Sequence, residues 1–376
     1  MPSQSLPSLF SRDYVLLILM NFLLFMGFQL YPSGLPPYLK ELGASDVILG
    51  LATFLIAIPA IASRLLAGYF LDAYGRFGVL FCGLILMTVV AYFLGLAGTV
   101  GMILLLRGLH GIAWGAAATG AVTAVTDLIP RSRLGEGMGI FSLSCAVAMA
   151  IAPALALSLP YTWMFRLGVW FLGAAALLSL IVRYKKIAKG PRGPRTLIER
   201  ASLMPAIIVA FSNASYGAVV TFAALLGYER GAEHVGYFFA CYAIALMVSR
   251  PYVGKLADRW GCKTVIAPGI VLLLLSLVLL SLCFNTLTFL GCGALYGLAQ
   301  GTVMAGTQTL AILRAPQDRI GAANATYSSC FDLGLGIGAV LFGAVSEFTG
   351  YALMFTICGL TQILPFIILK LDKGRD

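Results

Sequence analysis

The segment Gly68–Leu80 reads Gly-Tyr-Phe-Leu-Asp-Ala-Tyr-Gly-Arg-Phe-Gly-Val-Leu, a short charged turn between two long apolar segments. The pattern recurs 186 residues further along the chain, in the segment that begins at Gly254. The positions that match in identity are Gly68/Gly254, Asp72/Asp258 and Gly75/Gly261. A single turn of this kind carries little information, but its repetition half a chain apart predicts a duplicated bundle of membrane helices.

The composition indicates a membrane protein. Of the 376 residues, 60% are hydrophobic and 11% are charged, whereas a soluble domain carries about 25% charged residues. The mean hydropathy is +0.95. The first uncharged run, Tyr14–Leu39, is long enough to span a bilayer. Because no small-residue cleavage site follows a short apolar core, we interpret it as a retained helix and not as a signal peptide.

Apolar runs of about 20 residues, separated by charged or Pro/Gly turns, predict twelve spans. The expected spans are 14–37, 46–70, 78–98, 101–128, 135–159, 163–183, 202–228, 234–256, 264–284, 286–313, 321–346 and 350–370. We therefore expect an all-α membrane protein with twelve transmembrane helices in two pseudo-symmetric six-helix bundles. The turns are too short for a soluble enzyme domain, and the sequence has no phosphate-binding Gly-x-x-x-x-Gly-Lys-Ser/Thr motif, so we expect neither an enzyme nor an ATP-driven pump.

A basic segment separates the two halves. Residues 183–200 hold seven Lys or Arg and one acid, and Gly-Pro pairs interrupt any helix there. We expect an N-terminal bundle at 1–183, a basic cytoplasmic linker at 184–200 and a C-terminal bundle at 201–376. With both termini in the cytoplasm, 21 of the 25 Lys and Arg lie on the cytoplasmic side. The positive-inside rule therefore predicts this orientation, and it explains the net charge of +10 without nucleic-acid binding.

The repeat extends through both halves at the same offset. Further matching pairs are Gly50/Gly236, Ser63/Ser249, Arg64/Arg250, Gly111/Gly297, Gly115/Gly301, Gly120/Gly306, Pro130/Pro316, Arg133/Arg319 and Gly135/Gly321. Because glycine is abundant, with 42 residues, the inference depends mainly on the three charged pairs. Six spans followed by six related spans predict parallel repeats about an axis along the membrane normal.

These motifs resemble those of the major facilitator superfamily. The turn at 68–80 is similar to its signature Gly-x-Leu-Ala-Asp-Arg-x-Gly-Arg-Lys, and Arg107-x-x-His110-Gly111 is similar to its fourth-span signature. The segment Phe331-Asp332-Leu333-Gly334 resembles the eleventh span of drug–proton antiporter and sugar-efflux-like members. In the fifth span, Ala148, Ala152 and Ala156 stand where antiporters have glycines, so small residues for close packing are kept. The resemblance implies a central cavity and rocking between inward- and outward-facing states.

The resemblance also implies a latch at the cytoplasmic turns. The residues that it assigns to gating are Arg64, Gly68, Asp72, Gly75, Arg76, Asp127, Arg133, Arg250 and Asp258. A carboxylate at such a turn can accept hydrogen bonds from helix N-terminal amides and pair with Arg. The alternative is a solvated turn with ordinary positive-inside arginines.

Three ionisable residues inside the spans are candidates for proton coupling or substrate binding. Asp332 lies eleven residues, or about 17 Å, beyond Gly321, and therefore near the bilayer midplane. Such a carboxylate is expected to face a cavity or a partner. Arg107 and His110 share a helix face, and the resemblance implies proton coupling or anion binding there. The alternatives are snorkelling of Arg107 to the interface and a structural hydrogen bond of His110.

A cavity lining follows from the spans that are central in the family, which are the first, fourth, seventh and tenth, together with one polar stripe on the eleventh. The expected lining residues are Asn21, Phe25, Phe28, Gln29, Trp114, Asn213, Tyr216, Tyr296, Gln300, Asn324 and Ser328. Individually, such residues more often serve helix packing. Together they predict an aromatic and amide pocket for an amphiphilic small molecule.

We therefore expect a secondary transporter of a small organic molecule, with proton-coupled efflux favoured. The alternatives are a proton-coupled or uniport importer, a lipid flippase and a substrate sensor that does not transport. We expect no cofactor and no metal site, because the eight cysteines are scattered through apolar segments, and we expect a proton gradient as the energy source. The expected partners are the substrate and membrane lipids, with a functional monomer and no nucleic acid. Short loops suggest a bacterial inner membrane.

Overall fold

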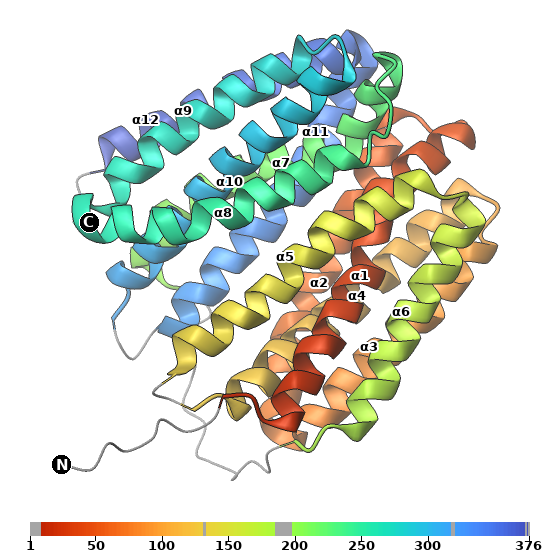
Figure 1. Cartoon of the computed structure of the whole chain (residues 1–376), viewed down its shortest axis with the longest axis vertical. Coiled ribbons are helices and arrows are strands. Elements are labelled where there is room, and N and C mark those ends of the chain that lie inside the picture. Colours follow the sequence, from red (N-terminus) through yellow and green to blue (C-terminus); the bar gives the residue numbers. More distant parts are fainter. Residues whose placement is uncertain (1–8, 131–132, 185–197, 317–319, 373, 375–376) are drawn as a thin grey trace.

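The computed structural model describes residues 9–130, 133–184, 198–316, 320–372 and 374. Within these ranges the regular structure is entirely helical (Figure 1). The helices are α1 Arg12–Glu41, α2 Asp46–Tyr74, α3 Arg76–Leu96, α4 Val100–Leu128, α5 Leu134–Ser158, α6 Tyr161–Ile181, the short 3₁₀ helix η2 Arg200–Ser202, α7 Leu203–Glu229, α8 Tyr237–Trp260, α9 Cys262–Ser281, α10 Thr286–Arg314, α11 Ile320–Leu360 and α12 Ile363–Leu371. Up to α10, these bounds lie within a few residues of the predicted spans.

The α11 helix contains two of the predicted spans. Its backbone leaves the helical region at Gly350, where φ is 72°, a value that favours glycine. The part after Gly350 continues through a turn into α12, as the predicted twelfth span requires. In the described residues, ten helical stretches are long and apolar enough to cross a bilayer, and Thr326–Leu371, which includes this break, is one of them. A shorter apolar stretch, Tyr237–Arg250, lies in α8. The all-α membrane fold is confirmed.

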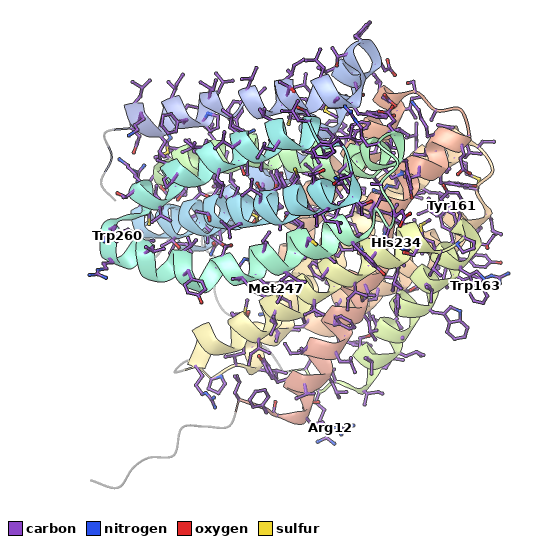
Figure 2. The ribbon with its side chains drawn as sticks, turned by 45° about the horizontal axis from the view of Figure 1, so that its top comes forward. Arg12, Tyr161, Trp163, His234, Met247 and Trp260 are labelled. Atoms are coloured by element: carbon purple, nitrogen blue, oxygen red, sulfur yellow. The ribbon has the colours of Figure 1, made fainter. Side chains whose placement is uncertain are left out.

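The helices form two bundles that lie side by side in both views of the molecule (Figure 1, Figure 2). In the first, α1 packs against α5 and α6, and α4 packs against α2 and α3. In the second, α7 packs against α11, and α10 packs against α8 and α9. Between the bundles, α2 contacts α11 and α5 contacts α8. These two helix pairs therefore form most of the interface across which the bundles can move.

The glycine pairs of the sequence repeat occupy equivalent places in the two bundles. Gly111 packs directly against the backbone oxygen of Ile56, and Gly297 packs in the same way against that of Tyr242. Ile56 and Tyr242 are themselves separated by the repeat offset of 186 residues. Neither site has room for a Cβ atom, because the carbonyl of the neighbouring helix fills it. The repeat is therefore structural and reflects the same close helix contact made twice.

We call the two ends of the molecule the Asp46 end and the linker end. The Asp46 end holds the turn between α1 and α2 and the break at Gly350; the linker end holds the start of α1, the end of α6 and the end of α12. In Figure 1 the bundles converge at the Asp46 end, at the upper right, and separate towards the linker end. The convergence is possible because bare backbone meets bare backbone: Gly50 lies against Ala339, and Gly236 lies against Ala154.

Candidate functional site

A cavity of about 340 Å³ lies between the bundles. Helices α1, α2, α4 and α5 of the first bundle and α7, α10 and α11 of the second contribute its walls. Its aromatic and polar lining residues are Phe25, Phe28, Gln29, Thr53, Trp114, Tyr216, Gln308, Tyr327, Ser328 and Phe331. Its charged lining residues are Arg64, Arg107 and Asp332. The cavity therefore combines a mainly apolar surface with three charged side chains.

Stacked rings form one wall of the cavity. Phe28 lies parallel to Trp114 with 3.8 Å between ring centroids, and Phe25 meets the same indole edge-on at 5.0 Å. On the opposite bundle, Tyr216 stacks on Tyr242 at 5.5 Å. Rings fixed by neighbouring rings lose little side-chain freedom when a ligand binds, so this wall suits a flat apolar or aromatic body.

An ion pair crosses the cavity from one bundle to the other. Arg64 of α2 places Nη1 2.7 Å from Oδ2 of Asp332 of α11. The side chains are 28% and 16% exposed, respectively. The buried Oδ2 atom makes no hydrogen bond, so the contact has the distance of an ion pair without the directionality of a hydrogen bond. A carboxylate held this loosely remains available to a competing donor.

Arg107 lies deeper and has a different environment. Its side chain is 1% exposed, Nε donates to the carbonyl of Ala52 at 3.0 Å, and Nη1 contacts Nδ1 of His110 at 3.3 Å. Arginine has no acceptor, so Nδ1 accepts this hydrogen bond and a neutral His110 carries its proton on Nε2. That Nε2 atom is buried without a hydrogen-bond partner, between the rings of Phe28 and Tyr31. Among the described residues, no carboxylate lies within ion-pair distance of Arg107.

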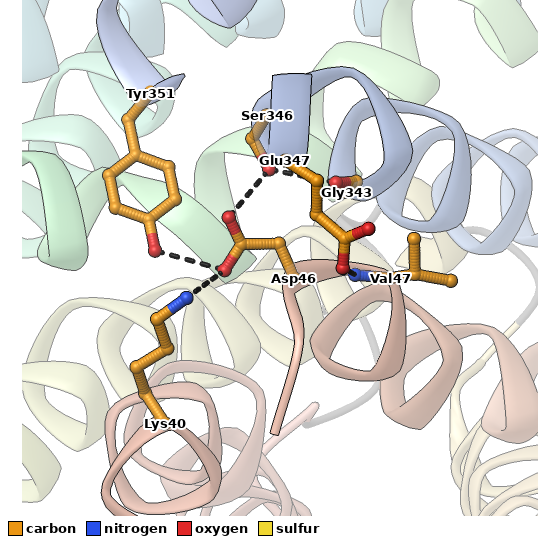
Figure 3. A network of polar contacts seen from close by, with 7 residues as sticks. All are labelled: Lys40, Asp46, Val47, Gly343, Ser346, Glu347 and Tyr351. Carbon is orange, nitrogen blue, oxygen red and sulfur yellow. Dashed lines mark hydrogen bonds and ion pairs between the residues drawn. The ribbon is translucent and has the colours of Figure 1, made fainter. Parts of the chain in front are cut away.

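A second polar cluster joins the bundles at the Asp46 end (Figure 3). Asp46, 5% exposed, contacts Nζ of Lys40 at 2.6 Å and accepts hydrogen bonds from Tyr351 and Ser346, each at 3.0 Å. The backbone amide of Val47 donates to a carboxylate oxygen of Glu347 at 3.1 Å. We call Lys40, Asp46, Ser346, Glu347 and Tyr351 the Asp46 cluster. It ties α1 and α2 to α11, and the sequence analysis did not find it.

At the linker end, two sets of ion pairs each lie within one bundle. Arg76 Nε contacts Asp127 at 2.7 Å and ties α3 to α4. In the second bundle, Lys263 and Arg314 both contact Asp372, at 2.8 and 2.6 Å. Burial alone would raise the pKa of Asp372, but the hydrogen bonds and charges of Arg314 and Lys263 outweigh burial and hold this pKa at about 2.

The other residues assigned to a latch are dispersed. Gly75 ends α2 with φ of 98°, as Gly261 does for α8 with φ of 85°. Arg64 lies in the cavity and not at the turn, and its repeat mate Arg250 is exposed on α8. Arg133 stands at the start of α5. Gly68, Asp72 and Asp258 lie on α2 and α8, but their surroundings are outside the described part of the structure.

The predicted lining divides into two groups. Phe25, Phe28, Gln29, Trp114, Tyr216 and Ser328 line the cavity. Five others lie elsewhere. Asn21 donates to Ser144 of α5 at 2.9 Å, and Asn324 is exposed. The remaining three belong to a network within the second bundle, in which Asn213 donates to the carbonyl of Phe331, Gln300 contacts Ser212 and Asn213, and Tyr296 contacts Ser215.

Sequence reasoning missed Thr53, Gln308 and Tyr327 in the cavity wall, and the Asp46 cluster. Thr53 contacts Thr221 across the bundles at 3.2 Å. Asp46 stands at the start of a predicted span, six residues after Lys40, which is one of the four basic residues not placed on the cytoplasmic side. This spacing was the one available signal for the cluster. Its partners on α11 are not visible in any local pattern.

Comparison with known proteins agrees with this architecture. The Major Facilitator Superfamily model matches residues 17–232 and 203–373. An uncharacterized MFS-type transporter of Methanocaldococcus jannaschii is 24% identical over 356 residues, covering 90% of this chain and 92% of the relative. The staphylopine export protein of Staphylococcus aureus is 23% identical over 364 residues, covering 89% of each.

Solved structures share the fold at lower identity. A crystal structure of a mutant of the nucleoside transporter NupG superposes with a TM-score of 0.83 at 13% identity, covering 96% of this chain and 99% of that one. The likeness in fold, the family match over most of the chain and the duplicated helical architecture agree. The chain therefore belongs to the Major Facilitator Superfamily, and it is a multi-pass membrane transporter and not an enzyme.

Proposed function

We propose that this protein exports small organic amphiphiles in exchange for protons. The observation that carries the proposal is the ion pair between Arg64 and Asp332, which joins the bundles through the cavity. A carboxylate in a mainly apolar cavity needs a cation, a proton or a hydrogen-bond donor beside it. Asp332 can satisfy this need with Arg64, with a proton or with a cationic group of the substrate. Because these partners compete for the same carboxylate, a proton and a substrate exclude each other, which is the requirement for exchange.

The direction of transport is supported by relatives whose names describe export. Besides the staphylopine export protein, a chloramphenicol efflux pump of Mycobacterium tuberculosis is 27% identical over 270 residues. A multidrug resistance protein MdtG of Erwinia billingiae is 28% identical over 369 residues, covering 89% of this chain. The apolar and aromatic cavity suits compounds of that kind better than highly charged metabolites.

The distribution of Lys and Arg supports a linker end in the cytoplasm, since 21 of 25 lie on that side. The relatives named above are prokaryotic, so we place the protein in a prokaryotic cytoplasmic membrane. With this orientation the Asp46 cluster closes the outer side, and the state described here is inward-facing. We assign the cluster the role of outer latch, because Asp46 holds contacts to both bundles.

A transport cycle follows from these contacts. A substrate from the cytoplasm enters the cavity and displaces Arg64 from Asp332. Rearrangement of the two bundles opens the Asp46 cluster and exposes the cavity to the outer side. A proton from the outer side binds Asp332, and the substrate leaves. After the return, loss of the proton to the cytoplasm restores the ion pair.

The experiment that tests this proposal is exchange in proteoliposomes that contain a trapped pH-sensitive dye. An imposed pH gradient should drive uphill movement of chloramphenicol, ethidium or an aminomethyl-biphenyl-carboxylate, and each should release protons in return. The Asp332→Asn variant should retain movement of the probes down their own concentration gradients and lose the response to the pH gradient. Flux of all three probes that is indifferent to the gradient would overturn proton coupling, and flux only in the direction of proton movement would indicate an importer.

A further inference from the structure

We propose that the cavity selects zwitterionic amphiphiles, with the anionic group of the substrate held by Arg107 and its ammonium group placed at Asp332. This inference rests on the proposed transport function and specifies the substrate class. Arg107 and Asp332 are the most deeply buried charges of the cavity, and they have opposite signs. They also belong to different bundles, so one bound molecule would contact both.

The donors of Arg107 are only partly used. A guanidinium group carries five N–H donors in a planar fork. Nε–H is committed to the carbonyl of Ala52, and one Nη1–H is committed to His110. In the described part of the chain, the guanidinium makes no further hydrogen bond to a protein acceptor, and Arg107 is part of the cavity lining. The fork therefore presents donors to the cavity in the geometry that matches a carboxylate.

The charge balance points in the same direction. A buried cation without a counter-ion is destabilising, and Arg107 is 1% exposed with neutral partners only among the described residues. Arg64, in contrast, is 28% exposed, so water can solvate it once it leaves Asp332. After this release, the buried charges that remain are the cation at Arg107 and the anion at Asp332. A molecule with one carboxylate and one ammonium group neutralises both.

The spacing of the two charges sets the length of the molecule. Gly336 of α11 packs against Phe54 and Ala57 of α2. Asp332 lies one turn nearer the linker end, so it stands about two helical turns, or roughly 10 Å, from the level of Ala52, where Arg107 is anchored. The stacked pair Phe28 and Trp114 belongs to the same cavity wall as Arg107. The arrangement suits a flat apolar body with opposite charges at its two ends.

The test uses an aminomethyl-biphenyl-carboxylate, its methyl ester and its N-acetyl derivative, which differ in one charge each. Binding to the purified full-length protein is measured by isothermal titration calorimetry near neutral pH, without a gradient. We expect the ester and the N-acetyl compound each to bind at least about tenfold more weakly than the zwitterion, which corresponds to about 1.4 kcal/mol. Because this comparison uses the unmodified protein, it does not depend on the folding of a variant.

Variants assign the effect to Arg107. Arg107→Gln should abolish the preference for the zwitterion over the ester and retain the preference over the N-acetyl compound. Arg166→Gln is the matched control, since Arg166 is exposed and packs over Trp163 outside the cavity; it should retain both preferences. Circular dichroism and thermal melting confirm that each variant is folded.

Three results would overturn the inference. If the ester binds as tightly as the zwitterion, Arg107 does not hold an anion. If the N-acetyl compound binds as tightly, the substrate is not dipolar. If none of the compounds binds with a Kd below about 1 mM, the cavity does not take this class. None of these results depends on proton exchange. A negative binding result would therefore overturn the proposed substrate class and would not affect the gradient-driven test of transport.

Discussion

Arg64 and Asp332 belong to different bundles, yet their charged groups approach to 2.7 Å inside the cavity. The carboxylate oxygen of this contact is buried and makes no hydrogen bond. The pair therefore links the relative position of the bundles to the occupancy of one carboxylate. This relationship is more informative than the depth of Asp332 alone, because it identifies what a proton or a substrate must displace.

Removing Arg64 should favour cationic ligands. In Arg64→Gln, the methyl ester of the aminomethyl-biphenyl-carboxylate should bind about tenfold more tightly, because its ammonium group no longer competes with the guanidinium for Asp332. Calorimetric titration measures the change. Arg166→Gln is the matched control, since Arg166 is exposed and packs over Trp163 outside the cavity. Unchanged or weaker binding in Arg64→Gln would show that the ion pair does not compete with ligands.

Removing the carboxylate of the Asp46 cluster should loosen the outer side. Asp46→Ala loses the ion pair with Lys40 and the hydrogen bonds from Tyr351 and Ser346. Hydrogen bonds to charged groups contribute about 1.5–3 kcal/mol each, so amide hydrogen exchange around 343–351 should accelerate by about tenfold or more. Exchange mass spectrometry measures this rate. Glu41→Ala, which loses a hydrogen bond from Tyr161 within one bundle, should leave it unchanged.

The close helix contact at Gly297 should tolerate no side chain. In Gly297→Ala, the new methyl group meets the backbone of Tyr242, and α8 and α10 must separate. Overpacking of this kind destabilises by about 1–3 kcal/mol. Gly291→Ala on the same helix meets open space and should be neutral or slightly stabilising. Melting temperatures of the purified proteins compare the two, and equal values would contradict the packing argument.

Asp372 should make stability depend on acid pH. Its pKa of about 2 in the folded protein, held by Arg314 and Lys263 against the effect of burial, lies below the ordinary value of 3.8. A lowered folded-state pKa contributes stability above the ordinary value, and the contribution is lost as the pH falls towards 2. Because solvent screens a partly exposed ion pair, the contribution near neutral pH is on the order of 1 kcal/mol.

The measurement is thermal unfolding of the protein and of Asp372→Asn across about pH 5 to pH 2. The variant should be less stable at the upper end of the range, and the difference should shrink as the pH falls. A difference that stays constant across the range would mean that the charge of Asp372 does not contribute through this pairing.

The sequence predicts the spans and the repeat well, because both follow from local properties. Apolar runs must be about 20 residues long to cross a bilayer, and their bounds are visible in the chain. Gly111 and Gly297 occur at equivalent positions of the repeat, because each helix contact leaves no room for a Cβ atom. The sequence is sufficient to predict a feature that depends on one segment alone, such as a span, or a feature that occurs at equivalent positions of both halves, such as the glycine contacts.

The cavity is predicted less well in the second bundle. Asn213, Tyr296 and Gln300 have the polarity of ligand contacts, but hydrogen bonds inside their own bundle satisfy them. Helical periodicity shows which face of a helix is polar and not which helix that face meets. For the same reason, Asp332 could not be derived as the partner of Arg64, nor Ser346 and Tyr351 as partners of Asp46. These three residues lie on α11, far along the chain.

The contacts of Gly50 with Ala339 and of Gly236 with Ala154 place smooth main chain against smooth main chain where the bundles converge. Interlocked side chains would have to disengage and re-engage whenever one half turns against the other. A contact surface without protruding side chains lets one bundle move over the other with little steric resistance. Bulky side chains at these positions would interlock, and they would block the relative movement of the bundles even in a protein that binds its substrate normally.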